Sequence, residues 1–289
     1  MKLDYLMLGH ITRDVLPDRS TTPGGTSLYA ALTAHHLGLR AGVVSAPAAL
    51  PAHWPASIQL AFHDSPTPPT FENIYTPQGR KQILHTASEP ITLSAIPAEW
   101  RAAPVVHLGP VLAETPEALV FAFPHSLLGV TPQGWMRRWD VPLPGPVIYT
   151  PWQPAPAVLA RIDALVLSIE DVRGDEELPR SYAQHCPLVA VTRGVAGATL
   201  YLNGEPYHIP AFAAAERDPT GAGDVFAATL FVRLSETKDA LAAARYAAYV
   251  AALSVEGMGI STIPERGVIE AGLLQARLVA SQASGEGAG

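Results

Sequence analysis

The chain has 289 residues, 48% of them hydrophobic and 16% charged, so it can bury a large core and general disorder is excluded. Nineteen basic and 26 acidic residues give a net charge of −7, which argues against a protein that chiefly binds nucleic acid or anionic lipid. A single cysteine, Cys186, excludes an internal disulfide and a cysteine-rich metal site.

No apolar run approaches the roughly 18 residues that a membrane-spanning helix requires. The first ten residues, MKLDYLMLGH, are too short a stretch for a signal peptide and become acidic too early. We therefore expect a soluble globular protein located in the cytoplasm.

The first fifty residues predict a β-α-β unit. Leu3–Gly9 is a short apolar run, typical of a buried strand in a parallel sheet. Ser27–Leu37 is expected to form a helix, with Thr26 as its N-cap and Gly38 as its C′ residue. Ala41–Ala46 follows as a second buried strand. Similar short runs predict further strands at Val105–Gly109, Ala164–Ser168 and Leu188–Thr192.

Between Pro66 and Pro90 the sequence predicts a β-hairpin that stands apart from the main sheet. Thr70–Tyr75 and Lys81–Thr86 alternate polar and apolar residues around a Thr-Pro-Gln-Gly-Arg turn. A two-stranded ribbon of this kind is not stable alone, so we expect a small β flap on a larger core.

A second hairpin, Ala198–Asn203 with Pro206–Pro210, turns at Asn203-Gly204 and is expected at an antiparallel edge of the main sheet. The C-terminal third predicts three helices, at Gly223–Leu234, Lys238–Glu256 and Pro264–Ala280. These elements predict an α/β fold: a doubly wound, mostly parallel sheet flanked by helices.

The segment Asp218-Pro-Thr-Gly-Ala-Gly-Asp224 carries the clearest chemical signal. Small residues at 221–223 allow backbone N–H groups to approach an anion at the start of a helix. Asp224 in the first turn can accept a hydroxyl proton, and the combination suits phosphoryl transfer to an alcohol. The alternative is an ordinary glycine turn before a helix that begins with aspartate.

This motif is similar to the most specific signature of the ribokinase-like (PfkB-type) carbohydrate kinase family. A second family signature has a counterpart in Gly24-Gly25, which leads into the first predicted helix. The step from Gly9 to Asp14 resembles the glycine-to-aspartate step at the sugar site of these kinases. Thr192-Arg-Gly194 resembles their Thr-x-Gly nucleotide turn. The resemblance extends over the chain from about residue 3 to about residue 275.

The resemblance implies a single ribokinase-like kinase domain over 1–289, with an inserted lid formed by the hairpin at about 67–90 and by about 14–24. We expect the lid to gain order by closing over the acceptor. The implied reaction is ATP-dependent phosphorylation of a hydroxyl on a sugar, an inositol-like polyol or a nucleoside. Mg²⁺ is the implied metal, with a monovalent cation as a further candidate, and the lid offers a surface for a homodimer.

The resemblance also assigns roles to residues. Asp224 is the implied catalytic base, and the implied anion hole is Gly221, Ala222 and Gly223. The implied acceptor pocket is Asp14, Gly24, Gly25 and Tyr29. The implied nucleotide contacts are Thr192, Gly194, Asp218, Thr220, Gly257 and Gly259.

Two departures from the family pattern affect the acceptor and metal sites. Tyr29 stands where the family commonly has asparagine, so its ring either packs on a substrate or belongs to the core. The family's Asn-x-x-Glu, which organises magnesium and phosphate, aligns with Ser168-Ile-Glu-Asp171. Ser168 and Asp171 keep the polarity with less reach, and Glu170 is an additional carboxylate, so Glu170 and Asp171 are the candidate metal ligands.

Other functions have less support from the sequence. No Gly-Lys-Ser/Thr phosphate loop and no Gly-x-Gly-x-x-Gly after the first strand are present. The compact segment Thr131–Arg137, after the apolar run Leu127–Val130, is either an active-site wall or ordinary packing. Two hypotheses therefore remain: a small-molecule kinase, or a non-catalytic ligand-binding or regulatory descendant of the same fold.

Overall fold

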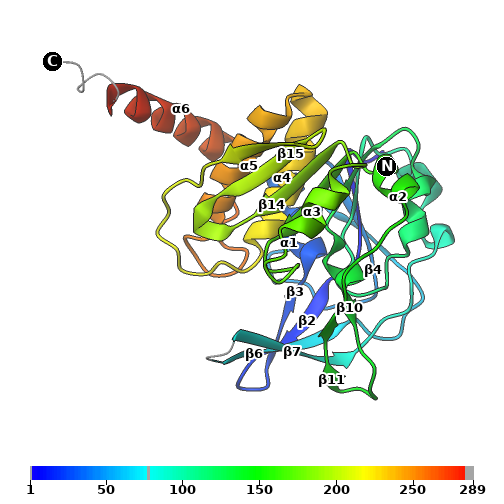
Figure 1. The fold of residues 1–289 in the computed structure, drawn as a ribbon. Helices are drawn as coiled ribbons and strands as arrows, with labels where there is room; N and C mark the ends of the chain where they lie inside the picture. Colours follow the sequence, from blue (N-terminus) through cyan, green and yellow to red (C-terminus); the bar gives the residue numbers. More distant parts are fainter. Residues whose placement is uncertain (1, 77–78, 284–289) are drawn as a thin grey trace.

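A nine-stranded sheet lies at the centre of the computed structural model, which describes residues 2–76 and 79–283 (Figure 1). Its strands follow the order β16-β15-β14-β13-β9-β8-β1-β4-β5. Neighbours from β14 to β5 are parallel, whereas β15 and β16 run antiparallel at one edge. In chain order the strands are β1 (Tyr5–Leu8), β4 (Ala41–Ser45), β5 (Gln59–Phe62), β8 (Val105–Leu108), β9 (Leu127–Val130), β13 (Ala164–Ser168), β14 (Leu188–Thr192), β15 (Ala198–Leu202) and β16 (Glu205–Ile209).

The strands predicted for this sheet are confirmed. The bounds of β13 and β14 equal the predicted apolar runs. In the β15–β16 hairpin, Asn203 and Gly204 have positive φ angles of 51° and 86°, which a two-residue hairpin turn requires. The edge strand β5 was not predicted, because Gln59-Leu60-Ala61-Phe62 contains no β-branched residue.

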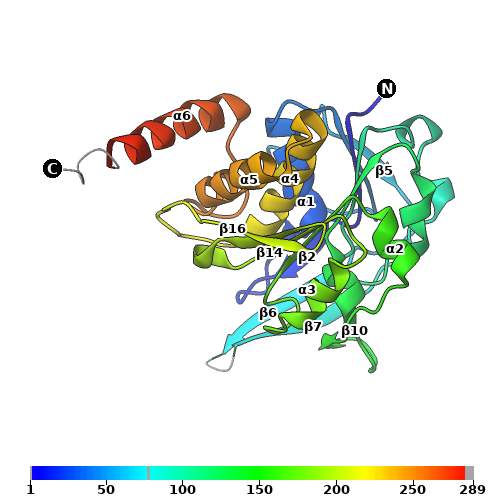
Figure 2. The ribbon, with the colours of Figure 1, turned by 45° about the horizontal axis from the view of Figure 1, so that its top comes forward.

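Alternate side chains of β1 pack into two hydrophobic layers, one on each face of the sheet. Tyr5 and Met7 belong to the layer beneath the helices α1 (Thr26–His36), α4 (Ala222–Thr237) and α5 (Ala240–Ser254). Leu6 and Leu8 belong to the opposite layer, with α2 (Pro156–Arg161) and α3 (Glu177–Tyr182). Figure 2 shows helices on both sides of the sheet. The predicted doubly wound α/β fold is confirmed.

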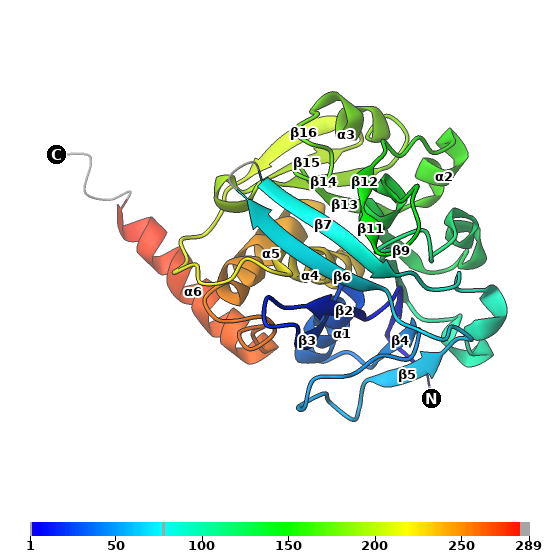
Figure 3. The ribbon, with the colours of Figure 1, turned by 90° about the horizontal axis from the view of Figure 1, so that it is seen from below.

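A smaller, five-stranded sheet lies beside the main one, with the order β11-β7-β6-β2-β3 (Figures 1 and 3). Its strands within the described residues are β2 (Thr12–Val15), β3 (Thr21–Gly24), β6 (Thr70–Thr76), β7 (Gly79–Thr86) and β11 (Gly145–Pro146). The hairpin strands are thus flanked by β2 and β11, and Phe71 and Leu84 are buried against Val111 and Leu112. Sheet pairing with β2 and β11 therefore supports this segment, and its ordering on closure over an acceptor stays a prediction. The predicted turn residues 77–78 lie outside the described residues.

The start of α1 differs from the prediction. The helix begins at Thr26 and its N-cap is Gly25, whose φ is +86°, so Thr26 is not the N-cap. The side chain of Thr26 is used elsewhere, in a hydrogen bond with Asp224. Gly38 after the helix has a φ of +85°, as expected of a C′ glycine.

The remaining elements are short, apart from the last helix. β10 (Arg137–Arg138) and β12 (Ile148–Tyr149) form a two-stranded pair. The 3₁₀ helices are η1 (Leu93–Ala95), η2 (Ala98–Trp100), η3 (Glu117–Ala122), η4 (Pro132–Met136) and η5 (Gly194–Ala196). Within residues 2–76 and 79–283, no helix has both the length and the apolar character needed to cross a membrane.

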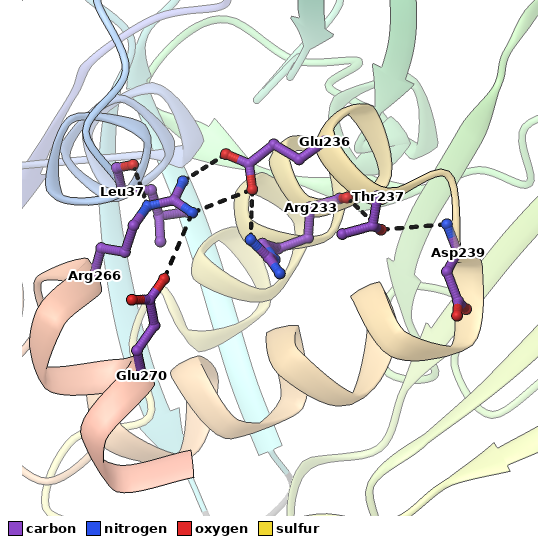
Figure 4. A network of polar contacts seen from close by, with 7 residues as sticks. All are labelled: Leu37, Arg233, Glu236, Thr237, Asp239, Arg266 and Glu270. Carbon is purple, nitrogen blue, oxygen red and sulfur yellow. Dashed lines mark hydrogen bonds and ion pairs between the residues drawn. The ribbon is translucent and has the colours of Figure 1, made fainter. Parts of the chain in front are cut away.

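A polar network fastens the last helix, α6 (Arg266–Ala283), to the rest of the molecule (Figure 4). The Arg266 guanidinium binds both carboxylate oxygens of Glu236 in α4, at 2.6 and 3.2 Å. Its Nε donates to the carbonyl of Leu37, at 2.8 Å. Arg233 also donates to Glu236, at 2.6 Å. One arginine therefore joins the beginning of α6 to α4 and to the end of α1.

Candidate functional site

In the main sheet, the direction in which successive strands are added reverses beside β1. The chain adds β4 and β5 on one side of β1, and later adds β8, β9 and β13 on the other. Ligands of open α/β sheets bind outside the carboxyl ends of the strands at such a reversal. At these ends Gly9 and Gly109 approach so closely that a Cβ on Gly9 would lie 2.3 Å from the Gly109 carbonyl oxygen. The candidate site is therefore expected above β1 and β8.

The glycine loop before α4 lies on the ring of Tyr29. Gly221 is the N-cap of α4 with a φ of +79°, and a Cβ there would lie 2.2 Å from Tyr29 Cδ1. Both the left-handed conformation and the close approach require glycine. No atom lies within 4 Å of a Cβ built on Gly223, so this part of the loop faces open space.

Asp224 lies half-buried in the first turn of α4, next to this loop. Burial and, to a smaller extent, the nearby carboxylate of Asp171 raise the pKa of its carboxyl group, which is about 6. A hydrogen bond with Thr26 and the positive charge of Arg137 act in the opposite direction. The carboxyl group is thus set to exchange a proton near neutral pH.

The predicted acceptor residues Asp14, Gly24 and Gly25 come together where β2 and β3 pair. A Cβ on Gly24 would lie 2.3 Å from Asp14 Oδ2, so a larger residue at position 24 would displace this carboxylate. Thr12 donates to Asp14 Oδ1 at 3.3 Å. Tyr29 does not line an open pocket: it is 6% exposed and belongs to the core beneath α1 and α4. Of the two alternatives for Tyr29, a ring that packs on a substrate or a ring that belongs to the core, the structure supports the second.

An open cleft of about 330 Å³ lies between β7 and the segments that follow β9 and β13. Asp171 is on its wall, where Oδ1 accepts from Gln133 Nε2 at 2.7 Å and Oδ2 accepts from the Ser168 N–H at 2.9 Å. Glu170 also lines the cleft and is exposed. The charges of Asp171 and Arg137 act on Asp224, so the cleft adjoins the candidate base.

Asp218 connects the glycine loop to the turn after α5. Its Oδ1 accepts the Thr220 N–H at 3.0 Å and its Oδ2 accepts the Gly259 N–H at 2.8 Å. Asp218 therefore holds Thr220 and Gly259, which are two other residues of the predicted nucleotide site. Thr192, at the end of β14, lies in register with Ser168 of β13, and Gly194 follows it with a φ of +55°.

The predicted metal ligands Glu170 and Asp171 are consecutive carboxylates on the cleft wall. No group of three or more histidine, cysteine, aspartate or glutamate side chains suited to a metal occurs in the described part of the chain. Both carboxylate oxygens of Asp171 accept hydrogen bonds, whereas Glu170 is exposed. Mg²⁺ commonly keeps several waters and needs only one or two carboxylates besides substrate phosphates, so the chemistry of these two side chains is compatible with such an ion.

Sequence reasoning missed several residues that the fold brings to the site. Lys81 comes from β7, and Thr26 from α1 reaches Asp224. Gln133 and Arg137 lie in the segment 131–137, for which an active-site wall was one of two alternatives, and both line the cleft. Only the position of that segment after a parallel strand signalled this role.

Comparison with known proteins supports the resemblance. Residues 171–266 match the model of the pfkB family carbohydrate kinases. A bifunctional protein HldE from Caulobacter sp. (strain K31) is 42% identical over 84 residues, and one from Rhodopseudomonas palustris (strain HaA2) is 40% identical over 79. These matches cover 29% and 27% of this chain but only 17% and 16% of the two relatives. The chain therefore corresponds to about a sixth of their length.

Solved structures agree over nearly the whole chain. A pyrophosphate-dependent kinase of the ribokinase family matches with a TM-score of 0.74 and 21% identity, covering 92% of this chain and 99% of that one. Ribokinase from Thermotoga maritima matches with a TM-score of 0.67 and 19% identity, covering 94% and 99%. The ribokinase-like fold is confirmed. The family match over residues 171–266 agrees with the prediction of a small-molecule kinase.

Proposed function

We propose that this chain is a ribokinase-like (PfkB-type) carbohydrate kinase and that it phosphorylates a hydroxyl group of a sugar, polyol or nucleoside. One observation carries the proposal: Asp224, a carboxyl group with a pKa near 6, lies at the start of α4 beside an open glycine loop and a cleft. The alternative of a non-catalytic descendant rests on the replacement of the family's Asn-x-x-Glu by Ser168-Ile-Glu-Asp171.

The proposed mechanism uses the chain's own groups in three roles. Asp224 accepts the proton of the acceptor hydroxyl as the hydroxyl oxygen forms a bond to the donor's terminal phosphorus. The bond from that phosphorus to the bridging oxygen breaks, and ADP leaves (phosphate, if pyrophosphate is the donor). The backbone N–H groups at 221–223, at the positive end of α4, stabilise the charge of the transferred group. Asp14, Gly24 and Gly25 contact the acceptor, and the small sheet shields the reaction from water.

ATP is the proposed donor, bound along Thr192, Gly194, Thr220, Gly257 and Gly259. Pyrophosphate is a second candidate, because similar structures include a pyrophosphate-dependent kinase complexed with a pyrophosphate analog and myo-inositol. Glu170 and Asp171 would hold Mg²⁺, which neutralises donor phosphates when bound. The proposed location is the cytoplasm, where ATP is available, and the proposed route to a dimer is pairing through the small sheet.

The raised pKa of Asp224 predicts the pH dependence of turnover. The base must be ionised, so kcat/KM with ATP should fall about tenfold per pH unit below pH 6 and level off above it. A pH–rate profile from pH 4.5 to 8.5, with an acceptor that does not titrate, measures this. A profile flat down to pH 4.5 would contradict the role of Asp224.

The candidate metal pair predicts a shift in the magnesium requirement. Glu170→Gln and Asp171→Asn should each raise the Mg²⁺ concentration needed for half-maximal rate by roughly three- to tenfold, because each removes one carboxylate from the ion. Glu177→Gln, an exposed carboxylate in α3 paired with Arg180, is the matched control. Unchanged magnesium titrations in both cleft variants would place the ion elsewhere.

The function itself is tested by phosphoryl transfer. Purified protein is incubated with Mg²⁺, either ATP or pyrophosphate, and a panel of sugars, cyclitols and nucleosides, and phosphorylated products are detected by mass spectrometry. Acceptor-dependent product formation with either donor is the expected result. Tight binding of a panel compound without transfer from either donor would instead support the non-catalytic alternative.

A further inference from the structure

We infer that Tyr29 is a positioning residue for phosphoryl transfer: its ring supports Gly221 and thereby fixes the backbone N–H groups at 221–223. This inference deepens the proposed function and rests on it. Tyr29 is the fourth residue of α1 and is 6% exposed, so it acts through the glycine loop and not on a ligand. The loop carries the N–H groups proposed to stabilise the transferred group, so its position affects the rate.

Gly221 lies directly against the Tyr29 ring. The three atoms nearest to a Cβ built on Gly221 are Cδ1, Cε1 and Cγ of that ring, at 2.2, 2.3 and 2.5 Å. In addition, the Gly221 carbonyl accepts the Val225 N–H at 2.9 Å. The backbone at 221 is thus held by an aromatic ring and by the first turn of α4. A change in the size or position of the ring therefore changes the position of the loop.

Two contacts with matching spacing join α1 to the start of α4. Thr26 forms a hydrogen bond with Asp224. Tyr29, three residues after Thr26, contacts Gly221, three residues before Asp224. Residues three apart on a helix lie on the same face, so one face of α1 supports both the candidate base and the glycine loop. The ring therefore helps to set the position of the loop relative to the base.

The hydroxyl end of Tyr29 reaches the turn after α5. Apart from its neighbours in the chain, the atom nearest to a Cβ built on Gly259 is Tyr29 Oη, at 3.9 Å. Gly259 is itself connected to the loop, because its N–H donates to Asp218 Oδ2 at 2.8 Å. One side chain therefore adjoins both the glycine loop and the turn that belongs to the predicted nucleotide site.

Carboxylates from the predicted donor, base and acceptor residues surround this hydroxyl. Burial raises the pKa of Tyr29, and the charges of Asp218, Asp224 and Asp14 raise it further. The hydroxyl therefore stays protonated near neutral pH, and Tyr29 adds no charge beside the transferred group. Its contribution to the reaction is the shape and the place of an uncharged ring.

Tyr29→Ala should lower kcat about 10- to 100-fold, because a displacement of the loop by about 1 Å misdirects its N–H groups. The KM of the acceptor should change less than about threefold, since these groups act on charge that develops in the transition state. Tyr29→Phe keeps the ring and should keep kcat within about threefold. Steady-state kinetics with ATP and with pyrophosphate measure all variants. Unchanged kcat in Tyr29→Ala, or an equal loss in Tyr29→Phe, would overturn the inference.

Tyr246→Ala is the matched control, because Tyr246 belongs to the same hydrophobic layer and is 4% exposed. Both alanine variants remove a buried ring and should lower the melting temperature. Tyr246→Ala should nevertheless leave kcat unchanged. A loss of kcat equal to that of Tyr29→Ala would overturn the inference, by tracing the effect to a general loosening of the core. Tyr29→Leu, which fills more of the core, repeats the comparison if Tyr29→Ala does not fold.

A double-mutant cycle tests the contact itself. Gly221→Ala is introduced into the unaltered protein and into Tyr29→Ala, where the ring that its Cβ would meet is absent. We expect Gly221→Ala to lower kcat at least about fivefold less in the Tyr29→Ala background than in the unaltered protein. Equal losses would overturn the inference, since they would show that the two positions act independently.

Amide hydrogen exchange tests the support of the loop without turnover. In the ligand-free protein the Val225 N–H donates to the Gly221 carbonyl, so its exchange rate reports on the stability of the loop. Tyr29→Ala should accelerate this exchange at least about tenfold, and Tyr246→Ala should not. Unchanged exchange in Tyr29→Ala would overturn the inference. Faster exchange together with no transfer by the unaltered protein to any acceptor would count against the proposed function and leave the support of the loop by Tyr29 intact.

Discussion

Asp224→Asn is expected to lower kcat by about 10²–10⁴, because the amide cannot accept the acceptor's proton. The side chain keeps nearly the same shape at the start of α4, so folding and acceptor affinity should change little. Steady-state kinetics with saturating donor and acceptor measure the effect. Turnover near that of the unaltered protein would exclude Asp224 as the base.

Asp224→Asn should also change the stability of the protein, and this change is a control for damage to the fold. Burial raises the pKa of Asp224 to about 6 from 3.8, so ionisation opposes folding as the pH rises from about 4 to about 6. The neutral amide removes this cost. The melting temperature of the Asn variant should therefore exceed that of the unaltered protein above pH 6 and approach it below pH 4. A lower melting temperature at pH 8 would show that lost activity reflects damage to the fold.

Gly221→Ala should reduce kcat/KM by at least about 100-fold and also lower the melting temperature. At a φ of +79°, a side chain costs on the order of 1–2 kcal/mol, and its Cβ would meet the Tyr29 ring at 2.2 Å. Either the ring or the beginning of α4 must move. A displacement of about 1 Å at a catalytic group can cost about 10² in rate.

Gly267→Ala is the control for the glycine substitution. Gly267 lies in α6, and no atom lies within 4 Å of a Cβ built on it. Its replacement should leave kcat/KM unchanged. Calorimetric melting curves and steady-state rates are measured for both variants. A Gly221→Ala enzyme with full activity would show that the loop tolerates displacement and is not an anion hole of fixed geometry.

Local sequence patterns predicted the sheet well, because buried parallel strands are short apolar runs whose ends are marked by small or polar residues. β13 and β14 illustrate this. The start of α1 was harder, since Thr26 has the residue type of an N-cap, and only the tertiary contact with Asp224 reveals its other use. The strand partners of the hairpin were also hard to predict, because those of β6 and β7 come from residues 12–15 and 145–146.

The motif residues of the candidate site were predictable because they are adjacent in sequence: the glycine loop and Asp224 form one segment. The cleft was not predictable, since Lys81, Arg137 and Arg173 are distant along the chain and meet only after the two sheets have formed. Periodicity also could not place Tyr29 under Gly221, because that contact joins the first helix to a loop almost two hundred residues later.

Together with the contact at Thr26, the polar network at α6 gives α1 a hydrogen bond to another helix at each of its ends. At one end Thr26 bonds to Asp224, and at the other the Leu37 carbonyl receives Arg266. Arg266→Ala would remove one of these two attachments. The beginning of the C-terminal helix therefore helps to hold the same helix whose first residue bonds to the candidate base.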